Sequence, residues 1–211
     1  MYILTAYNTR SLTGAAQEFK LAHVLALKEQ CAIYAPNVPF KCLSDVNIAD
    51  VDCVPYKHGW PGWWIKLFAF SPDVPGDFLF MDLDTVIRGP LDDILAVKKL
   101  TVLRDFYRDG VKLKEGLGSG LIYLPESARK QVWDFWMTHP QWHQRMYPRG
   151  DQFLLERFWL NTAQRWQDVV PGQVVSWKVH CAKGVPPEAR VIAFHGQPRP
   201  WSVGQFLHLY R

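Results

Sequence analysis

The chain has 211 residues, of which 48% are hydrophobic and 21% are charged, and its formal net charge at pH 7 is +4. This composition is that of a globular protein with a sizeable core, and it excludes a disordered chain. No apolar run reaches the roughly 18 residues that a membrane-spanning helix needs, so we expect no membrane span.

The cysteine pattern bears on the cellular compartment. Four cysteines lie far apart, and no Cys-x-x-Cys pair occurs among them. In a chain of this length such spacing indicates buried thiols in a reducing compartment, and not a disulfide or zinc framework. Residues 1–7 have no basic leader and too short an apolar core for a signal peptide. We therefore expect a cytoplasmic protein.

Strands and helices are predicted to alternate along the chain. Apolar runs between turn residues predict strands at 1–7, 40–44, 51–55, 77–84, 99–103, 121–124, 174–177 and 190–194. Helical spacing and capping residues predict helices at about 14–32, 63–70, 127–137 and 151–159, with a short helix starting at Pro90. This alternation predicts an α/β sandwich with a mostly parallel central sheet.

Two aspartates interrupt the apolar segment 78–87. Because side chains alternate along a strand, Asp82 and Asp84 are expected to point to the same side. Two adjacent carboxylates in an apolar setting are costly unless a positive group lies between them. Their hard oxygen ligands suit magnesium, manganese or calcium. The alternative is that one carboxylate caps a helix and the other forms a salt bridge.

Other strand ends supply further polar groups. In open α/β sheets, ligands bind outside the carboxyl ends of the strands. The first strand ends at residues 5–8, the central one at Asp82 and Asp84, and the last at His195. Two carboxylates and an imidazole suit Mn²⁺ or Mg²⁺, with positions left open for a diphosphate. Arg199 follows closely, and arginine binds phosphate oxygens with two nitrogens.

Tryptophans and basic residues form two further patterns. Trp60, Trp63 and Trp64 lie in a turn-like Gly/Pro setting, which is typical either of burial or of a stacking surface for a sugar or base. Residues 178–211 hold five bases and one acid, so this segment carries a charge equal to the whole net excess. It either faces phosphates or forms a solvated basic tail.

The order of these motifs resembles that of GT-A-fold glycosyltransferases, in particular the glycogenin and lipopolysaccharide-galactosyltransferase group. The matching segments cover most of the chain and are Thr5-Ala6-Tyr7-Asn8, Trp64-Ile65-Lys66-Leu67, Phe80-Met81-Asp82-Leu83-Asp84, Ser119-Gly120-Leu121-Ile122, Gly150-Asp151-Gln152, and His195 with Arg199-Pro200-Trp201. Each motif alone is weak, but all six occur in the expected order. The chain departs from the pattern at Gly118, where the family has Asn. It also departs at Arg199, which replaces Lys at a shorter interval from His195.

The resemblance implies a GT-A-like three-layer sandwich and a single glycosyltransferase domain over residues 1–211. Its nucleotide-binding half would span about 1–105, and its acceptor and C-terminal metal and phosphate element about 106–211. It implies a metal-dependent hexosyltransferase of the retaining type, which moves a sugar from a nucleoside-diphosphate sugar, most simply a UDP-sugar, to an acceptor hydroxyl. The acceptor is open between a glycan, a lipid-linked sugar, a protein and a modified DNA base.

The resemblance also implies roles for individual residues. Mn²⁺ or Mg²⁺ is expected on Asp82, Asp84 and His195. The donor is expected to contact Thr5, Ala6, Tyr7, Asn8, Asp45, Lys66, Asp82, Leu83, Ser119, Gly120, Gly196 and Arg199.

Three residues are expected near the reacting sugar. Asp151 and Gln152 match the family's positions at the anomeric centre. In an inverting enzyme Asp151 would be the general base, whereas a retaining enzyme requires no protein base. The alternative for Asp151 is a helix cap. Asp105 is expected either to bind donor hydroxyls or to form a salt bridge with Arg104 or Arg108.

Two other functions are compatible with parts of the sequence. A haloacid-dehalogenase-type phosphatase also carries Asp-x-Asp at a strand end, with the first aspartate as nucleophile. Against it, the motif lies far from the N-terminus and no later acidic pair follows. A sugar- or nucleic-acid-binding module could use the tryptophans and the basic segment, but it would not need two carboxylates.

Overall fold

The structure is a computed structural model that describes residues 1–11, 18–106 and 116–210. Its strands are β1 (Tyr2–Tyr7), β2 (Phe40–Ser44), β3 (Asp52–Pro55), β4 (Phe78–Met81), β5 (Thr85–Ile87), β6 (Thr101–Arg104), β7 (Leu117–Leu124), β8 (Gln164–Arg165), β9 (Val174–Ser176) and β10 (Val191–Ala193). Its α-helices are α1 (Leu21–Tyr34), α2 (Asp92–Ala96), α3 (Lys130–Thr138), α4 (Pro140–Met146), α5 (Asp151–Trp159), α6 (Trp166–Val169) and α7 (Trp177–His180). Its 3₁₀ helices are η1 (Gly62–Phe70), η2 (Glu126–Ala128), η3 (Pro200–Ser202) and η4 (Gly204–Tyr210).

The larger sheet has seven strands in the order β3-β2-β1-β4-β7-β6-β8. β1 is parallel to β2 and β4, β2 to β3, and β6 to β8, whereas β7 is antiparallel to β4 and β6. The sheet is therefore mostly parallel, as predicted. A smaller sheet has the order β5-β10-β9.

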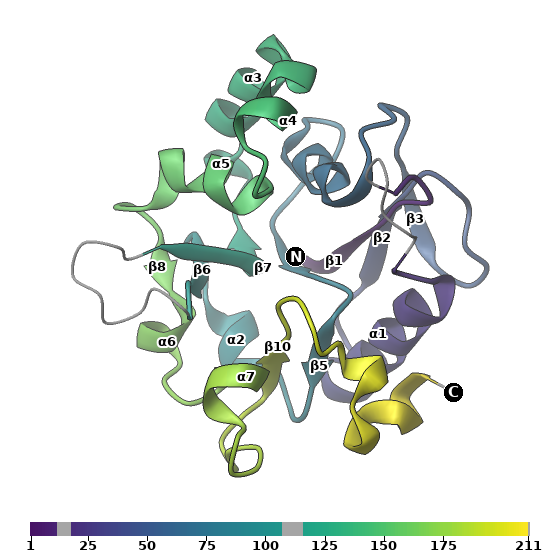
Figure 1. Cartoon of the computed structure of the whole chain (residues 1–211), viewed down its shortest axis with the longest axis vertical. Coiled ribbons are helices and arrows are strands. Elements are labelled where there is room, and N and C mark those ends of the chain that lie inside the picture. Colours follow the sequence, from purple (N-terminus) through teal and green to yellow (C-terminus); the bar gives the residue numbers. More distant parts are fainter. Residues whose placement is uncertain (12–17, 107–115, 211) are drawn as a thin grey trace.

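Alternating side chains of the central strands pack into two separate cores. In β4, Phe78 and Phe80 contribute to one core, while Leu79 and Met81 contribute to the other. The first core also contains residues of η1, α3 and α5, and the second contains residues of α1, α2 and α6. Figure 1 shows α3, α4 and α5 on one side of the sheet and α1 and α2 on the other. The predicted three-layer α/β sandwich is confirmed.

The aspartate pair lies at the junction of the two sheets. The predicted strand 77–84 is wrong at its end, because β4 stops at Met81 and residues 82–84 form a turn. The chain then enters β5, which pairs with β10 in the smaller sheet. The turn is held by Asp82 N–H donating to Gly120 O at 2.9 Å and Thr85 N–H donating to Asp82 O at 3.0 Å. β4 and β5 are both fully buried, so their apolar residues resemble one continuous strand.

Several other boundaries differ from prediction. The predicted helix 14–32 begins at Leu21, and residues 14–17 of that prediction lie outside the described residues. Segment 62–70 is a 3₁₀ helix. The strand predicted at 121–124 is longer, because β7 already starts at Leu117; the two glycines in its first half weaken the sequence signal for a strand. The predicted helix 127–137 divides into η2 and α3. Residue 177 begins α7 and does not end a strand. The unpredicted elements are short: β8, α4, α6, α7, η3 and η4.

The tryptophan cluster serves mainly the core. Trp60 and Trp64 are buried, whereas the Trp63 side chain is 43% exposed. Trp136 of α3 is fully buried, with its ring 5.1 Å from that of Trp64 and 5.0 Å from that of Trp60. Burial therefore explains Trp60 and Trp64, and Trp63 alone of the three can offer an open face.

The cysteines and the helices agree with two predictions from the sequence, namely free thiols and the absence of a membrane-spanning helix among the described residues. All four cysteines are free, and Cys31, Cys42 and Cys181 are buried. Within the three described ranges, no helix is both long enough and apolar enough to cross a bilayer.

Trp136→Ala tests the packing of the core between η1 and α3. Removing a fully buried indole should lower the free energy of unfolding by about 3–5 kcal/mol. Trp142→Ala is the matched control, because the Trp142 side chain is 52% exposed and its loss should cost less than about 1 kcal/mol. Urea unfolding followed by fluorescence measures both. Equal effects would show that Trp136 does not anchor this core.

Candidate functional site

A cavity of about 560 Å³ opens where the ends of β1 and β4 meet the segment that follows β10. It contains most of the residues predicted for the site: Ala6, Tyr7, Asn8, Lys66, Asp82, Leu83, Asp84, Asp105, Ser119, Gly120, Asp151, Gln152, His195, Gly196 and Arg199. The predicted meeting of three strand ends is therefore confirmed, although β10 belongs to the smaller sheet.

Two predicted residues do not line this cavity. The Thr5 side chain is fully buried, and its hydroxyl donates to Met81 O at 2.8 Å. Asp45 accepts a hydrogen bond from Thr9 N–H at 3.0 Å. The hydrogen bond to the neighbouring strand β4 and the complete burial of Thr5 keep its side chain out of the cavity. A nucleoside in this cavity would meet Ala6 and not Thr5.

Lys66 is the buried centre of the cavity wall. Its ammonium lies 2.8 Å from Asp82 Oδ1 and 3.1 Å from Asp151 Oδ2, and it donates to Ser119 O at 3.1 Å. Burial lowers the pKa of Lys66, but the charges of Asp151 and Asp82 outweigh burial and raise it above its ordinary value. Lys66 stays charged and joins η1, β7, α5 and the turn after β4.

Asp151 occupies the first position of α5. Gly150 precedes it as the N-cap residue with φ of +98°, a conformation that favours glycine. A Cβ atom at Gly150 would also lie 3.0 Å from Trp63 Nε1. Asp151 is therefore not the cap itself; its side chain is buried in contact with Lys66.

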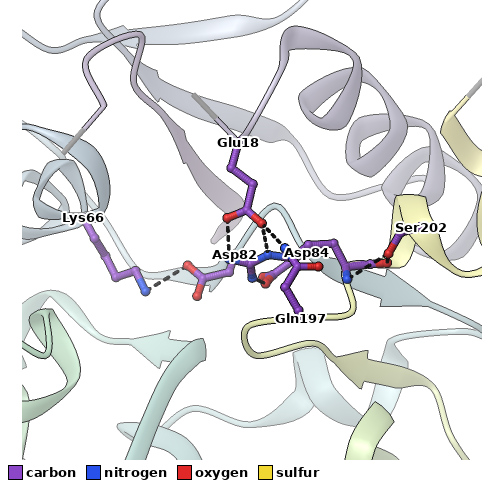
Figure 2. Close-up of polar contacts among 7 residues, drawn as sticks. Glu18, Lys66, Asp82, Asp84, Gln197 and Ser202 are labelled. Carbon is purple, nitrogen blue, oxygen red and sulfur yellow. Dashed lines mark hydrogen bonds and ion pairs between the residues drawn. The ribbon is translucent and has the colours of Figure 1, made fainter. Parts of the chain in front are cut away.

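Arg199 is a second cation of the cavity, and it contacts two carboxylates that both belong to residues 1–105. Its Nε and Nη2 each donate to Glu18 at 2.7 Å, and its Nη1 donates to Asp84. Gln197 Nε2 also donates to Glu18, at 2.9 Å. Figure 2 shows Lys66 reaching Asp82, and Glu18 pointing toward the segments that carry Asp84 and Gln197. Of the basic C-terminal segment, Arg199 thus faces the cavity.

The two aspartates retain mutual repulsion despite these partners. Burial raises the pKa of Asp82, and Lys66 opposes this rise. Burial and the charge of Asp82 raise the pKa of Asp84 to about 7, against the effect of Arg199. Carboxylate oxygens of this kind are the ligands that a hard divalent cation prefers.

His195 lies in the same cavity but is not joined to the aspartates. Its Nε2 lies 2.7 Å from Ser176 Oγ, and its ring stacks on Phe106 at 5.7 Å. Burial, with Lys178 and Arg199, lowers its pKa to about 4, so the ring is neutral at pH 7 and able to ligate a metal. Among the residues that the structure describes, no three His, Cys, Asp or Glu side chains form a ready metal site. The ligand set Asp82, Asp84 and His195 stays a prediction.

Asp105 and Gln152 both line the cavity and contact each other. Gln152 Nε2 donates to Asp105 Oδ2 at 3.1 Å. Arg104, one of the two predicted salt-bridge partners of Asp105, forms an ion pair with Asp168 at 2.6 Å. The other, Arg108, lies outside the described residues.

Glycines keep the wall beside Asp82 open. A Cβ atom at Gly120 would lie 3.3 Å from Asp82 Oδ2, and one at Gly118 would lie 3.0 Å from Leu103 Cβ. The tight contact at Gly118 explains why an asparagine would not fit there without a shift of Leu103.

Sequence reasoning did not single out several lining residues, among them Glu18, Phe19, Phe106 and Arg149. They belong to no recognisable motif. Glu18 lies far from Arg199 in sequence, and only the folded chain brings the two together. No local pattern would have found this pair.

The chain resembles known proteins in structure but not in sequence. No protein-family profile and no curated protein matches the sequence. Solved structures do match. The glycosyltransferase GlyE of Streptococcus pneumoniae TIGR4 is 14% identical with a TM-score of 0.68 over 99% of this chain and 58% of its own. The galactosyltransferase LgtC, solved with donor and acceptor sugar analogues, is 12% identical with a TM-score of 0.67 over 100% of this chain and 95% of its own.

The fold is that of GT-A-type glycosyltransferases. The bifunctional glycosyltransferase WbbM also matches, at 11% identity and a TM-score of 0.59 over 99% of this chain and 51% of its own. The chain thus spans little more than half of GlyE and WbbM but nearly all of LgtC. The predicted resemblance to the GT-A fold is confirmed.

Lys66→Met tests the buried charge network of this GT-A fold. Removing the ammonium leaves buried carboxylates without their partner and should cost about 3–5 kcal/mol at pH 8. The pKa of Asp82 is already raised, and it should rise further in the variant. The folded variant then binds more protons than the unfolded chain as pH falls, so part of the lost stability should return at pH 5.

Urea unfolding at pH 8 and pH 5 measures this effect. Lys41→Met is the matched control, because the Lys41–Asp52 pair is well exposed and its loss should cost less than about 1 kcal/mol at either pH. A Lys66→Met variant as stable as the control at pH 8 would contradict the network.

Proposed function

We propose that this protein is a metal-dependent glycosyltransferase that moves a hexose from a nucleoside-diphosphate sugar, a UDP-sugar, to an acceptor hydroxyl. The observation that carries the proposal is the pair of buried Asp84 and half-buried Asp82, flanked by Lys66 and Arg199 in the cavity of a GT-A fold. The fold of LgtC, which was solved with donor and acceptor sugar analogues, supports it.

The cation is assigned to Asp82 and Asp84, with His195 as a third ligand. A Mn²⁺ or Mg²⁺ ion bound there would act as a Lewis acid toward the leaving diphosphate. The chain itself contributes Arg199, which stays protonated and offers nitrogen donors to phosphate oxygens. Lys66 is fully engaged with Asp82, Asp151 and Ser119, so its role is to orient these groups.

The part of the cavity beside the start of α5 is assigned to the reacting sugar. Asp151 and Gln152 lie there, with Gln152 in contact with Asp105, and Trp63 offers an exposed ring for sugar stacking. Lys66 holds Asp151 in an ion pair, so this carboxylate already has a cationic partner within the cavity wall. This pairing supports a retaining reaction, with an oxocarbenium-like transition state.

The donor nucleoside is assigned to Ala6, Tyr7 and Asn8 at the end of β1. These residues belong to the proposed nucleotide-binding half, about 1–105, of a single domain over residues 1–211. The cavity also takes residues from about 106–211, which supports a division into donor and acceptor halves. A cytoplasmic location stays a prediction from the cysteine pattern. The acceptor stays open among a glycan, a lipid-linked sugar, a protein and a modified DNA base.

The two alternative functions have less support. If the protein were a haloacid-dehalogenase-type phosphatase, Asp82 would be the nucleophile. The carboxylate of Asp82 is instead paired with Lys66, and the fold is GT-A. If the protein were a sugar- or nucleic-acid-binding module, the tryptophans would form an open surface, but Trp60 and Trp64 are buried.

A thermal-shift screen tests the donor. UDP-, GDP-, CMP- and TDP-sugars are added with and without Mn²⁺. A UDP-sugar with Mn²⁺ should raise the Tm by about 5 °C at saturating concentration, since a ligand that binds only the folded state stabilises it. The same sugar without metal should have little effect. No response to any nucleotide would count against the proposed function.

Asp84→Asn tests the cation site with an almost isosteric change. It removes the negative charge, so sugar-nucleotide turnover should fall by more than about 100-fold and Mn²⁺-dependent UDP binding should be lost. Asp134→Asn is the control, because that carboxylate is exposed on α3. Turnover of the purified variant near the wild-type value would contradict the assignment.

A further inference from the structure

Glu18 forms the most complete ion pair in the cavity, although no motif includes it. Its two carboxylate oxygens accept from Nε and Nη2 of Arg199 at 2.7 Å each, in a forked arrangement. Such bidentate pairs fix the plane of the guanidinium as well as its position. The Arg199 side chain is 15% exposed and that of Glu18 34%, so the arginine is largely shielded from solvent and the carboxylate partly so.

Neighbouring residues hold both partners of this pair. The ring of Phe19 lies 5.2 Å from the guanidinium carbon of Arg199, and Gln197 donates to Glu18 at 2.9 Å. Trp201, two residues after Arg199, stacks on His23 of α1 with 3.7 Å between ring centroids. The segment before α1 and the C-terminal segment are therefore packed together beside the cavity. Figure 1 shows the C-terminal helices lying next to α1.

The bidentate ion pair with Glu18 uses two of the three guanidinium nitrogens of Arg199 and leaves the third for another contact. Nε and Nη2 face Glu18, while Nη1 contacts Asp84, the proposed metal ligand. An arginine without the fork would be able to turn both terminal nitrogens onto Asp84. It would then be withdrawn from any phosphate in the cavity.

We propose that Glu18 is a positioning residue for the diphosphate of the donor. It holds Arg199 by two nitrogens, so that Nη1 stays at the border between Asp84 and the space where the diphosphate binds. When the donor and its cation occupy the cavity, Nη1 exchanges Asp84 for a phosphate oxygen without movement of the rest of the side chain. This inference rests on the proposed function of the cavity.

The competing explanation is that Glu18 merely neutralises Arg199, and it predicts the opposite result. If only charge matters, removing the Glu18 carboxylate makes the cavity more positive and should strengthen diphosphate binding. Glu18→Asp keeps the charge and would then have no effect. If Glu18 positions Arg199, both Glu18→Gln and Glu18→Asp should weaken diphosphate binding, because neither preserves the fork.

Isothermal titration with UDP and with UMP, both in the presence of Mn²⁺, separates these explanations. In Glu18→Gln and Glu18→Asp the affinity for UDP should fall by about tenfold, the usual scale of a hydrogen-bonded charged contact. The affinity for UMP, which lacks the second phosphate, should change far less. A purely structural defect would lower both affinities and the Tm together, and this outcome would overturn the proposal.

A double-mutant cycle shows whether Glu18 acts through Arg199. In an Arg199→Met background, Glu18→Gln should cause no further loss of UDP affinity. Asp134→Asn again serves as the control for a neutralised surface carboxylate. UDP binding that is unchanged or stronger in both Glu18 variants would overturn the role of Glu18 alone. A wild-type protein that binds neither UDP nor UMP would overturn the proposed function and this inference with it.

Discussion

The turn that connects the two sheets holds two adjacent carboxylates, one buried and one half-buried, and most of the site depends on this one constraint. Asp82 and Asp84 lie between β4 and β5, where the chain leaves one sheet for the other. Burial of two adjacent negative charges is unfavourable unless cations are fixed nearby. Lys66 and Arg199 supply those cations from elements on opposite sides of the pair. Burial, followed by the charge of Asp82, raises the pKa of Asp84 against the effect of these cations.

The two cations also tie distant parts of the chain together. Lys66 links η1 to α5 and β7, and Arg199 links the C-terminal segment to Glu18, just before α1. Loss of either cation would leave charge buried without a partner, so the network contributes to stability. The same geometry leaves an open cavity with fixed charges at its wall, and in the proposed function such preorganised charge would favour a leaving group that becomes more negative.

Local patterns predicted the strands of the central sheet and most of the cavity, because each has a clear residue signature. The order of motifs around Asp82, Asp151 and His195 placed these residues in one cavity. Two kinds of feature could not be predicted. The boundary between β4 and β5 is hidden because both strands are buried and apolar, and the pair of Glu18 with Arg199 depends on tertiary packing. The burial of Thr5 against Met81 could not be predicted either, because the strand pattern locates the end of β1 but not which of its side chains the neighbouring strand covers.

The most direct test of the account is a crystal structure with Mn²⁺ and UDP, in which anomalous diffraction locates the manganese. The account predicts one anomalous peak within coordination distance of both Asp82 and Asp84, with the diphosphate between that ion and Arg199. Manganese bound away from the two aspartates, or a diphosphate bound outside this cavity, would contradict the central claim.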